Sequence, residues 1–70
     1  MKQITDEMIS ANMKAQRIRA GYTQESVAKA LKISRQTVIN WENNPSYVKA
    51  EVFRTLASMY GCLVLDFFVQ

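Results

Sequence analysis

The sequence has no histidine and a single cysteine, Cys62. One cysteine cannot form an intramolecular disulfide, and a Cys/His zinc site needs several ligands, so disulfide scaffolds and zinc fingers are excluded. We therefore expect no metal and no other cofactor, and we interpret Cys62 as a small buried hydrophobe.

Long apolar runs are also missing. No stretch approaches the roughly 20 residues of a membrane span, and residues 1–9 lack the apolar centre of a signal peptide. We expect a cytoplasmic protein that makes no use of a membrane.

A catalytic constellation is absent as well. Asp6 and Glu7 are adjacent at the start of a helical pattern rather than converging on a pocket, and no nucleophile with a neighbouring base can be identified. The sequence argues against an enzyme and indicates no small-molecule ligand.

The composition suits one small domain over residues 1–70. Hydrophobic residues make up 49% of the chain and charged residues 21%, enough for a single core. A domain of this size buries only about 60% of its unfolded surface, so a partner subunit would add stability. The net charge of +3 favours nucleic acid only mildly.

Two short helical patterns, over residues 24–31 and 35–41, are separated only by a three-residue corner, 32–34. Such a connection forces the two helices to cross in contact. Thr23 and Ser34 precede the helices and are predicted N-caps. Apolar residues flank both caps as hydrophobic staples: Tyr22 with Val27, and Ile33 with Val38.

The residues of this corner separate into an apolar face and a polar face. The inward positions are Val27, Ala28, Leu31, Ile33, Val38 and Trp41. The outward positions of the helix that follows the corner can all form hydrogen bonds and none is acidic: Arg35, Gln36, Thr37, Asn40 and Asn43. On an isolated helix such a face would be a solvated surface, but beside a fixed corner it suits DNA.

Hydrogen-bonding chemistry assigns these outward residues to bases. Arginine can donate twice to guanine O6 and N7, and glutamine or asparagine can pair with adenine N7 and N6, each pair contributing about 1–3 kcal/mol of discrimination. We predict base contacts in the major groove by Arg35, Gln36, Thr37 and Asn40. For Thr37, a phosphate or a thymine methyl group is the alternative target.

Helical patterns also flank the corner. One runs from a Thr5 cap to about Ala20 and stops at Gly21. The other covers residues 50–60 and carries an apolar stripe made of Val52, Phe53, Leu56, Ala57 and Tyr60.

These features together resemble the helix-turn-helix domains of the Cro and phage-repressor type, also called Xre-like. The resemblance covers nearly the whole chain and implies an all-α, compact five-helix bundle of the lambda-repressor-like type, with the helix-turn-helix as helices 2 and 3. It departs at the first corner residue, commonly glycine, which is Lys32 here. Either Lys32 adopts a left-handed backbone at a cost of about 1 kcal/mol, or the corner shifts. The matching residues are Arg17, Gly21, Thr23, Gln24, Ala28, Leu31, Ser34, Val38, Trp41, Glu42, Asn43 and residues 56–62.

The resemblance also implies roles outside the base-contacting face. Arg17 would pair with Glu42 and tie the first helix to the third. Gln24 begins a helix beside free N–H groups and would bind a phosphate of the DNA backbone. Further backbone contacts are implied at Ser34, Asn43, Asn44, Tyr47 and Lys49.

Residues 62–70 are almost entirely apolar, and only Asp66 is charged. We expect a short fifth helix with Val64 and Phe67 directed inward. The surplus apolar surface predicts a homodimer interface formed by Leu63, Leu65, Phe68 and Val69. Two alternatives stand beside it: the segment closes the core, or it pairs as a β-like segment with a neighbour.

The resulting hypothesis is a sequence-specific transcription regulator that binds double-stranded DNA. A symmetric dimer would place a third helix in each major groove of a palindromic operator, with half-sites about 34 Å apart. Repression by occupancy is what the resemblance implies. The alternative is a protein-interaction module of the same fold, such as an antitoxin that binds a toxin through residues 62–70.

Overall fold

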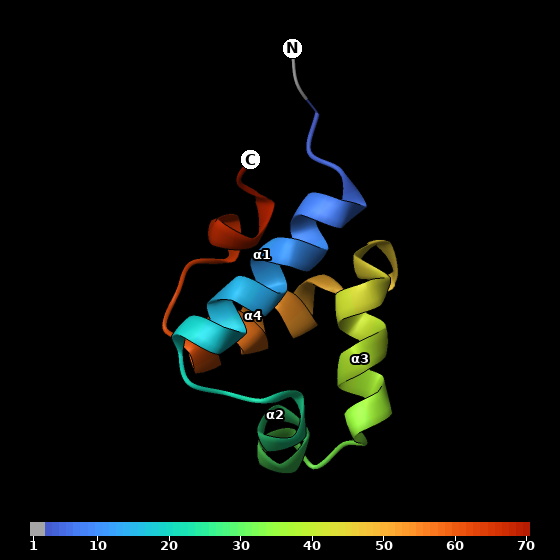
Figure 1. Cartoon of the computed structure of the whole chain (residues 1–70), viewed down its shortest axis with the longest axis vertical. Coiled ribbons are helices and arrows are strands. Elements are labelled where there is room, and N and C mark those ends of the chain that lie inside the picture. Colours follow the sequence, from blue (N-terminus) through green and yellow to red (C-terminus); the bar gives the residue numbers. More distant parts are fainter. Residues whose placement is uncertain (1–2) are drawn as a thin grey trace.

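The computed structural model describes residues 3–70, which form four α-helices and two short 3-10 helices with no strand among them (Figure 1). The all-α prediction is confirmed, and the last α-helix has the predicted bounds. In chain order the elements are α1 (Asp6–Arg19), α2 (Gln24–Leu31), α3 (Arg35–Asn43), η1 (Pro45–Tyr47), α4 (Ala50–Tyr60) and η2 (Val64–Phe68).

The prediction of a fifth α-helix is wrong, because η2 is a 3-10 helix. The carboxylate of Asp66 accepts a hydrogen bond from the Leu63 N–H at 2.9 Å, and the Asp66 N–H donates to the Leu63 carbonyl at 2.9 Å. Both bonds span three residues, which favours the tighter winding found in short pieces of helix. The side chain of Asn12 on α1 then donates to the carbonyls of Phe67 and Val69, at 3.0 and 2.7 Å, and holds the segment against α1.

Three of the α-helices end in the same way. A residue with positive φ follows each helix or its cap, and the next N–H donates at 3.0 Å to the carbonyl five residues earlier, as in a Schellman motif. Lys32 is the one non-glycine residue of the described chain with positive φ, so of the two alternatives for this corner the left-handed backbone is the one found. The three positions are Gly21 (φ 86°), Lys32 (φ 57°) and Gly61 (φ 69°).

Replacing Lys32 with glycine is expected to raise the free energy of unfolding by about 0.5–1 kcal/mol. The left-handed conformation costs a residue with a Cβ about 1–2 kcal/mol, and the greater entropy loss of glycine offsets only part of this relief. Thermal unfolding should shift upward by several degrees. Lys29→Gly removes the same charge from within α2 and should instead cost about 1 kcal/mol. A Lys32→Gly protein that melts no higher than the parent would contradict the backbone strain inferred at Lys32.

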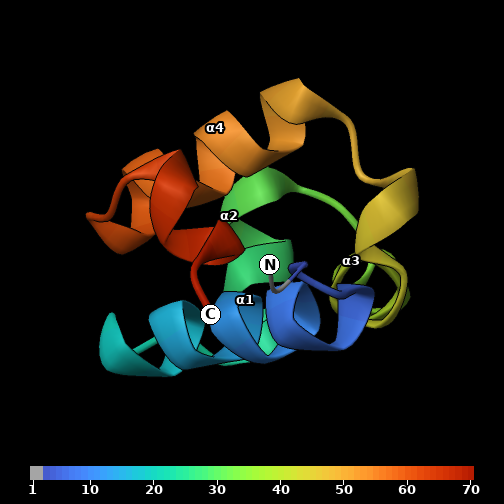
Figure 2. The ribbon, with the colours of Figure 1, turned by 90° about the horizontal axis from the view of Figure 1, so that it is seen from above.

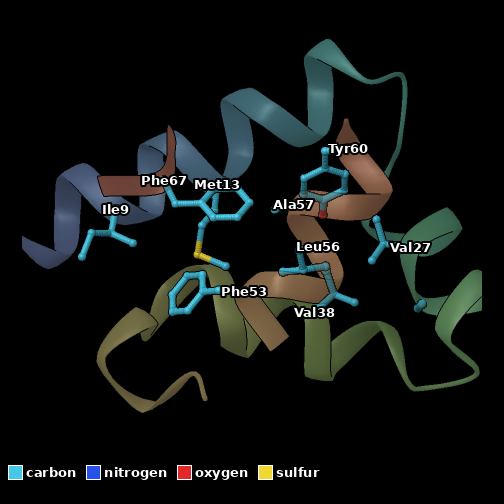
Figure 3. Close-up of a cluster of buried hydrophobic side chains, with 10 residues drawn as sticks. Ile9, Met13, Val27, Val38, Phe53, Leu56, Ala57, Tyr60 and Phe67 are labelled. Carbon is cyan, nitrogen blue, oxygen red and sulfur yellow. The ribbon is translucent and has the colours of Figure 1, made fainter. Parts of the chain in front are cut away.

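The core lies between α1 and α4, which occupy opposite sides of the bundle, and η2 contacts both (Figure 2). Phe67 from η2 is fully buried, with its ring centroid 5.7 Å from Phe53 and 6.3 Å from Tyr60 (Figure 3). Of the residues predicted to face inward at the corner, three are buried and three are half-buried, because α2 and α3 lie at the periphery. The buried ones are Val27, Ala28 and Val38, and the half-buried ones are Leu31, Ile33 and Trp41.

Because of Tyr60, the free energy of unfolding should depend on pH in the alkaline range. Burial, and secondarily the negative charge of Glu42, raise the pKa of Tyr60 well above the usual tyrosine value of 10.0. The unfolded chain therefore loses this proton first, so stability is fully present below about pH 10 and falls as the pH rises further. Urea unfolding between about pH 9 and 11.5 should show a decline that is smaller in Tyr60→Phe. Tyr47→Phe, at an exposed position, should leave the decline unchanged, and equal slopes for the two variants would contradict this assignment.

Candidate nucleic-acid interface

Glu42 is the one charged side chain in the described chain that is buried, at 2% exposure. Its carboxylate accepts hydrogen bonds from Arg17 Nε at 2.8 Å, from Arg17 Nη2 at 3.4 Å and from Gln24 Nε2 at 3.1 Å. Arg17 Nη1 also donates to the Tyr22 carbonyl at 3.1 Å. Arg17, Gln24 and Glu42, here called the Glu42 cluster, join α1, α2 and α3 and so fix the orientation of α3.

The first turns of α2 and α3 are both capped by side chains, as predicted. Thr23 Oγ1 accepts from the Ser26 N–H at 3.0 Å, and Ser34 Oγ accepts from the Thr37 N–H at 3.1 Å. The first N–H groups of each helix have no partner within the helix and point beyond its end. Such groups, with the positive end of the helix dipole, are suited to phosphate oxygens.

The outward side of α3 is polar and open to solvent. Arg35, Gln36, Asn40 and Asn43 are exposed, while Thr37 is half-buried and its hydroxyl lies 2.8 Å from Ser34 Oγ. α3 stands at the edge of the bundle, so its outward side is not covered by another helix (Figure 1). Gln36 and Asn40, the two residues on which the hypothesis depends most, are thus accessible.

The segment after α3 extends this surface. Tyr47 in η1 is 87% exposed, and Lys49, just before α4, is exposed too. Asn44 is exposed, although its side chain donates to the Asn40 carbonyl at 3.4 Å. A phenol, an ammonium and an amide therefore follow α3 in positions that could donate to phosphates.

A shallow depression lies between the starts of α2 and α3. Two guanidinium groups, Arg17 and Arg35, line it together with Thr23, Gln24 and Glu25. The sequence patterns did not predict that Arg35 would lie beside Gln24, nor that Gln24 would bond to Glu42. Arg35 gives this depression donors for an anion, but Glu25 also contributes a carboxylate to its lining.

A family model described as helix-turn-helix matches residues 13–67, from within α1 into η2. The chain belongs to the Xre-like helix-turn-helix family. It is accordingly a DNA-binding transcription regulator of the Xre type. No curated protein and no solved structure matches the chain.

This Xre-like protein carries a second exposed surface on η2, away from α3 (Figures 1 and 2). Leu63 and Leu65 are each 68% exposed and Val69 is 46% exposed. Phe68 is half-buried, because its ring packs 5.1 Å from that of Phe53.

None of the helices within residues 3–70 has both the length and the apolar composition that a membrane span requires.

Proposed function

We propose that this protein is a sequence-specific repressor that binds a palindromic operator in double-stranded DNA by inserting α3 into the major groove. The observation that carries the proposal is the exposed, acid-free outward side of α3, backed by buried Val38 and by the Glu42 cluster. α3 has nine residues and is thus about 13 Å long. The diameter of an α-helix with its side chains, about 10–12 Å, fits a major groove about 12 Å wide.

The side chains divide by position into those that meet bases and those that meet the backbone. Outward residues of the first turns of α3 would lie toward the groove floor, whereas residues at the start of α2, at the cap of α3 and at or after the end of α3 would lie toward the phosphates. The proposed base contacts are Arg35, Gln36, Thr37 and Asn40. The proposed backbone contacts are Gln24, Ser34, Asn43, Asn44, Tyr47 and Lys49.

A homodimer would form through Leu63, Leu65, Val69 and the outer edge of Phe68. This surface lies across the bundle from α3, so pairing two copies would leave both DNA-contacting helices free (Figure 2). The dimer would then bind two half-sites about 34 Å apart at the same time. We expect it to act in the cytoplasm.

The same exposed leucines favour a second candidate, an antitoxin that binds a toxin through this surface. The two candidates differ in what the purified chain does alone. Size-exclusion chromatography should give a dimer for the repressor, and DNA should shift it to a larger complex. If the chain is instead an antitoxin that requires its toxin, the purified chain alone should aggregate or remain monomeric.

Selection of bound sequences from a random DNA pool tests the proposal directly. A repressor of this kind should enrich two inverted half-sites with centres about one helical turn apart. A pool that shows no enrichment, with DNA bound only in a salt-sensitive and sequence-independent way, would contradict sequence-specific binding.

Gln24→Ala is expected to weaken binding to every DNA sequence by about tenfold, because the N–H of Gln24 that is not bonded to Glu42 is lost as a donor to a charged phosphate oxygen. Gln36→Ala is the matched control at an exposed glutamine, and it should weaken operator binding while leaving binding to random DNA nearly unchanged. Fluorescence anisotropy with operator and scrambled duplexes measures both. A loss confined to the operator in Gln24→Ala would argue against a phosphate contact.

A further inference from the structure

Asn12 of α1 uses both of its side-chain N–H groups on the C-terminal segment. Its Nδ2 donates to the Phe67 carbonyl at 3.0 Å and to the Val69 carbonyl at 2.7 Å. A primary amide nitrogen has two N–H groups, so neither is left over. These two hydrogen bonds, here called the Asn12 clasp, hold the end of η2 where the last residues of the chain lie beside α1 (Figures 1 and 2).

The two bonds act on parts of the segment that differ in how firmly the core holds them. Phe67 is anchored by its own ring, which is fully buried between Phe53 and Tyr60. Val69 lies beyond the 3-10 helix in an extended conformation (φ −85°, ψ 154°), and its side chain is exposed. The bond from Asn12 to the Val69 carbonyl therefore acts on the part of the segment that the core does not fix.

We propose that Asn12 is a positioning residue for the dimer surface. The clasp fixes Val69 and the outer edge of Phe68 relative to Leu63 and Leu65, so that the four side chains form one surface before a second subunit binds. The inference rests on the proposed homodimer and adds to it the residue that controls pairing. A surface that is already ordered loses less conformational freedom on association, and affinity rises accordingly.

The charge of this surface favours a second copy of the chain as its occupant. In a two-fold symmetric interface each residue lies close to its own counterpart, so a charged surface would face like charge. Residues 62–70 carry one charged side chain, Asp66, which is half-buried and whose carboxylate already accepts from the Leu63 N–H at 2.9 Å. Asn12 is neutral. Two copies can therefore meet without repulsion, whereas a strongly charged partner would find no opposite charge here.

The clasp enters dimerisation twice, because both copies must hold the segment in place. Asn12→Ala leaves the two carbonyls to water. A held fraction of about one third in each copy would raise the dimer dissociation constant about tenfold, since the fraction is squared. Asn12→Asp keeps the size of the side chain but has no N–H and sets a carboxylate against two carbonyl oxygens. It should therefore weaken the dimer more than Asn12→Ala does.

Sedimentation of the full chain over a range of concentrations measures this effect. Thr5→Ala is the matched control, because Thr5 caps the start of the same helix by accepting from the Met8 N–H at 3.2 Å. It destabilises α1 away from the clasp, so its dimer dissociation constant should stay within about twofold of the parent value. Circular dichroism checks that each variant is folded. The heteronuclear NOE of the Val69 amide should fall in Asn12→Ala and not in Thr5→Ala.

DNA binding gives a second readout that a loss of fold stability alone would not produce. Asn12→Ala should weaken binding to a duplex with both half-sites and leave binding to a duplex with one half-site unchanged, because one subunit suffices there. A parent chain that stays monomeric at every concentration overturns the homodimer and this inference together. A dimeric parent whose Asn12 variants pair equally well overturns the clasp alone. Equal weakening of the dimer in Thr5→Ala, or an equal loss on the single half-site, overturns it too.

Discussion

Arg17→Ala is expected to lower the free energy of unfolding by about 3–5 kcal/mol, because it leaves the Glu42 carboxylate buried without its ionic partner. The side chains of Arg17 and Glu42 are only 11% and 2% exposed, so water cannot replace the lost guanidinium. Gln24 would be the one remaining side-chain donor of the cluster, and the Tyr22 carbonyl would lose its bond from Arg17. A domain of this size has a total stability of roughly 3–5 kcal/mol, so most of the variant should be unfolded at 37 °C.

Two further proteins make this measurement decisive. Arg19→Ala removes the same charge from the same helix, but Arg19 is exposed and donates to the Tyr60 carbonyl at 2.6 Å, so it should cost only about 1 kcal/mol. Arg17→Met with Glu42→Leu removes both charges together and should recover much of the loss. Urea unfolding followed by circular dichroism measures all three. Equal losses of unfolding free energy in Arg17→Ala and Arg19→Ala would show that the ion pair between Arg17 and Glu42 is not needed for stability.

Features set by neighbouring residues could be predicted from the sequence. The caps at Thr23 and Ser34 each depend on an N–H three residues away, and the stop at Gly21 depends on the backbone freedom of one residue. The exposure of Gln36 and Asn40 follows from helical periodicity, since Val38 fixes the buried side between them. These features require no knowledge of how distant segments meet.

Features set by distant residues could not be predicted. The 3-10 form of η2 depends partly on Asn12, which bonds to the Phe67 carbonyl 55 residues away. The bond from Gln24 to Glu42 spans 18 residues, and the pattern around Gln24 gives no sign of it. The hydrogen bond from Gln36 to Asn40 is local, but its direction could not be predicted either, because spacing shows only that the two amides can meet.

The dimer surface and the core share one short segment, and substitutions can separate them. Phe67→Ala is expected to cost about 3–5 kcal/mol, because a fully buried ring between Phe53 and Tyr60 would be replaced by a cavity. With a total stability of similar size, the protein should lose its cooperative thermal transition.

Leu65→Ala removes an apolar side chain two residues earlier, but one that is 68% exposed, so the stability of the isolated subunit should change by less than about 0.5 kcal/mol. If η2 forms the dimer interface, Leu65→Ala should still weaken self-association, which sedimentation over a range of protein concentrations would detect. A folded Phe67→Ala protein would mean that η2 is not part of the core. A Leu65→Ala protein that dimerises as well as the parent would place the interface on another surface. The two substitutions thus test the two roles of one segment separately, because only one of the side chains is buried before a second subunit binds.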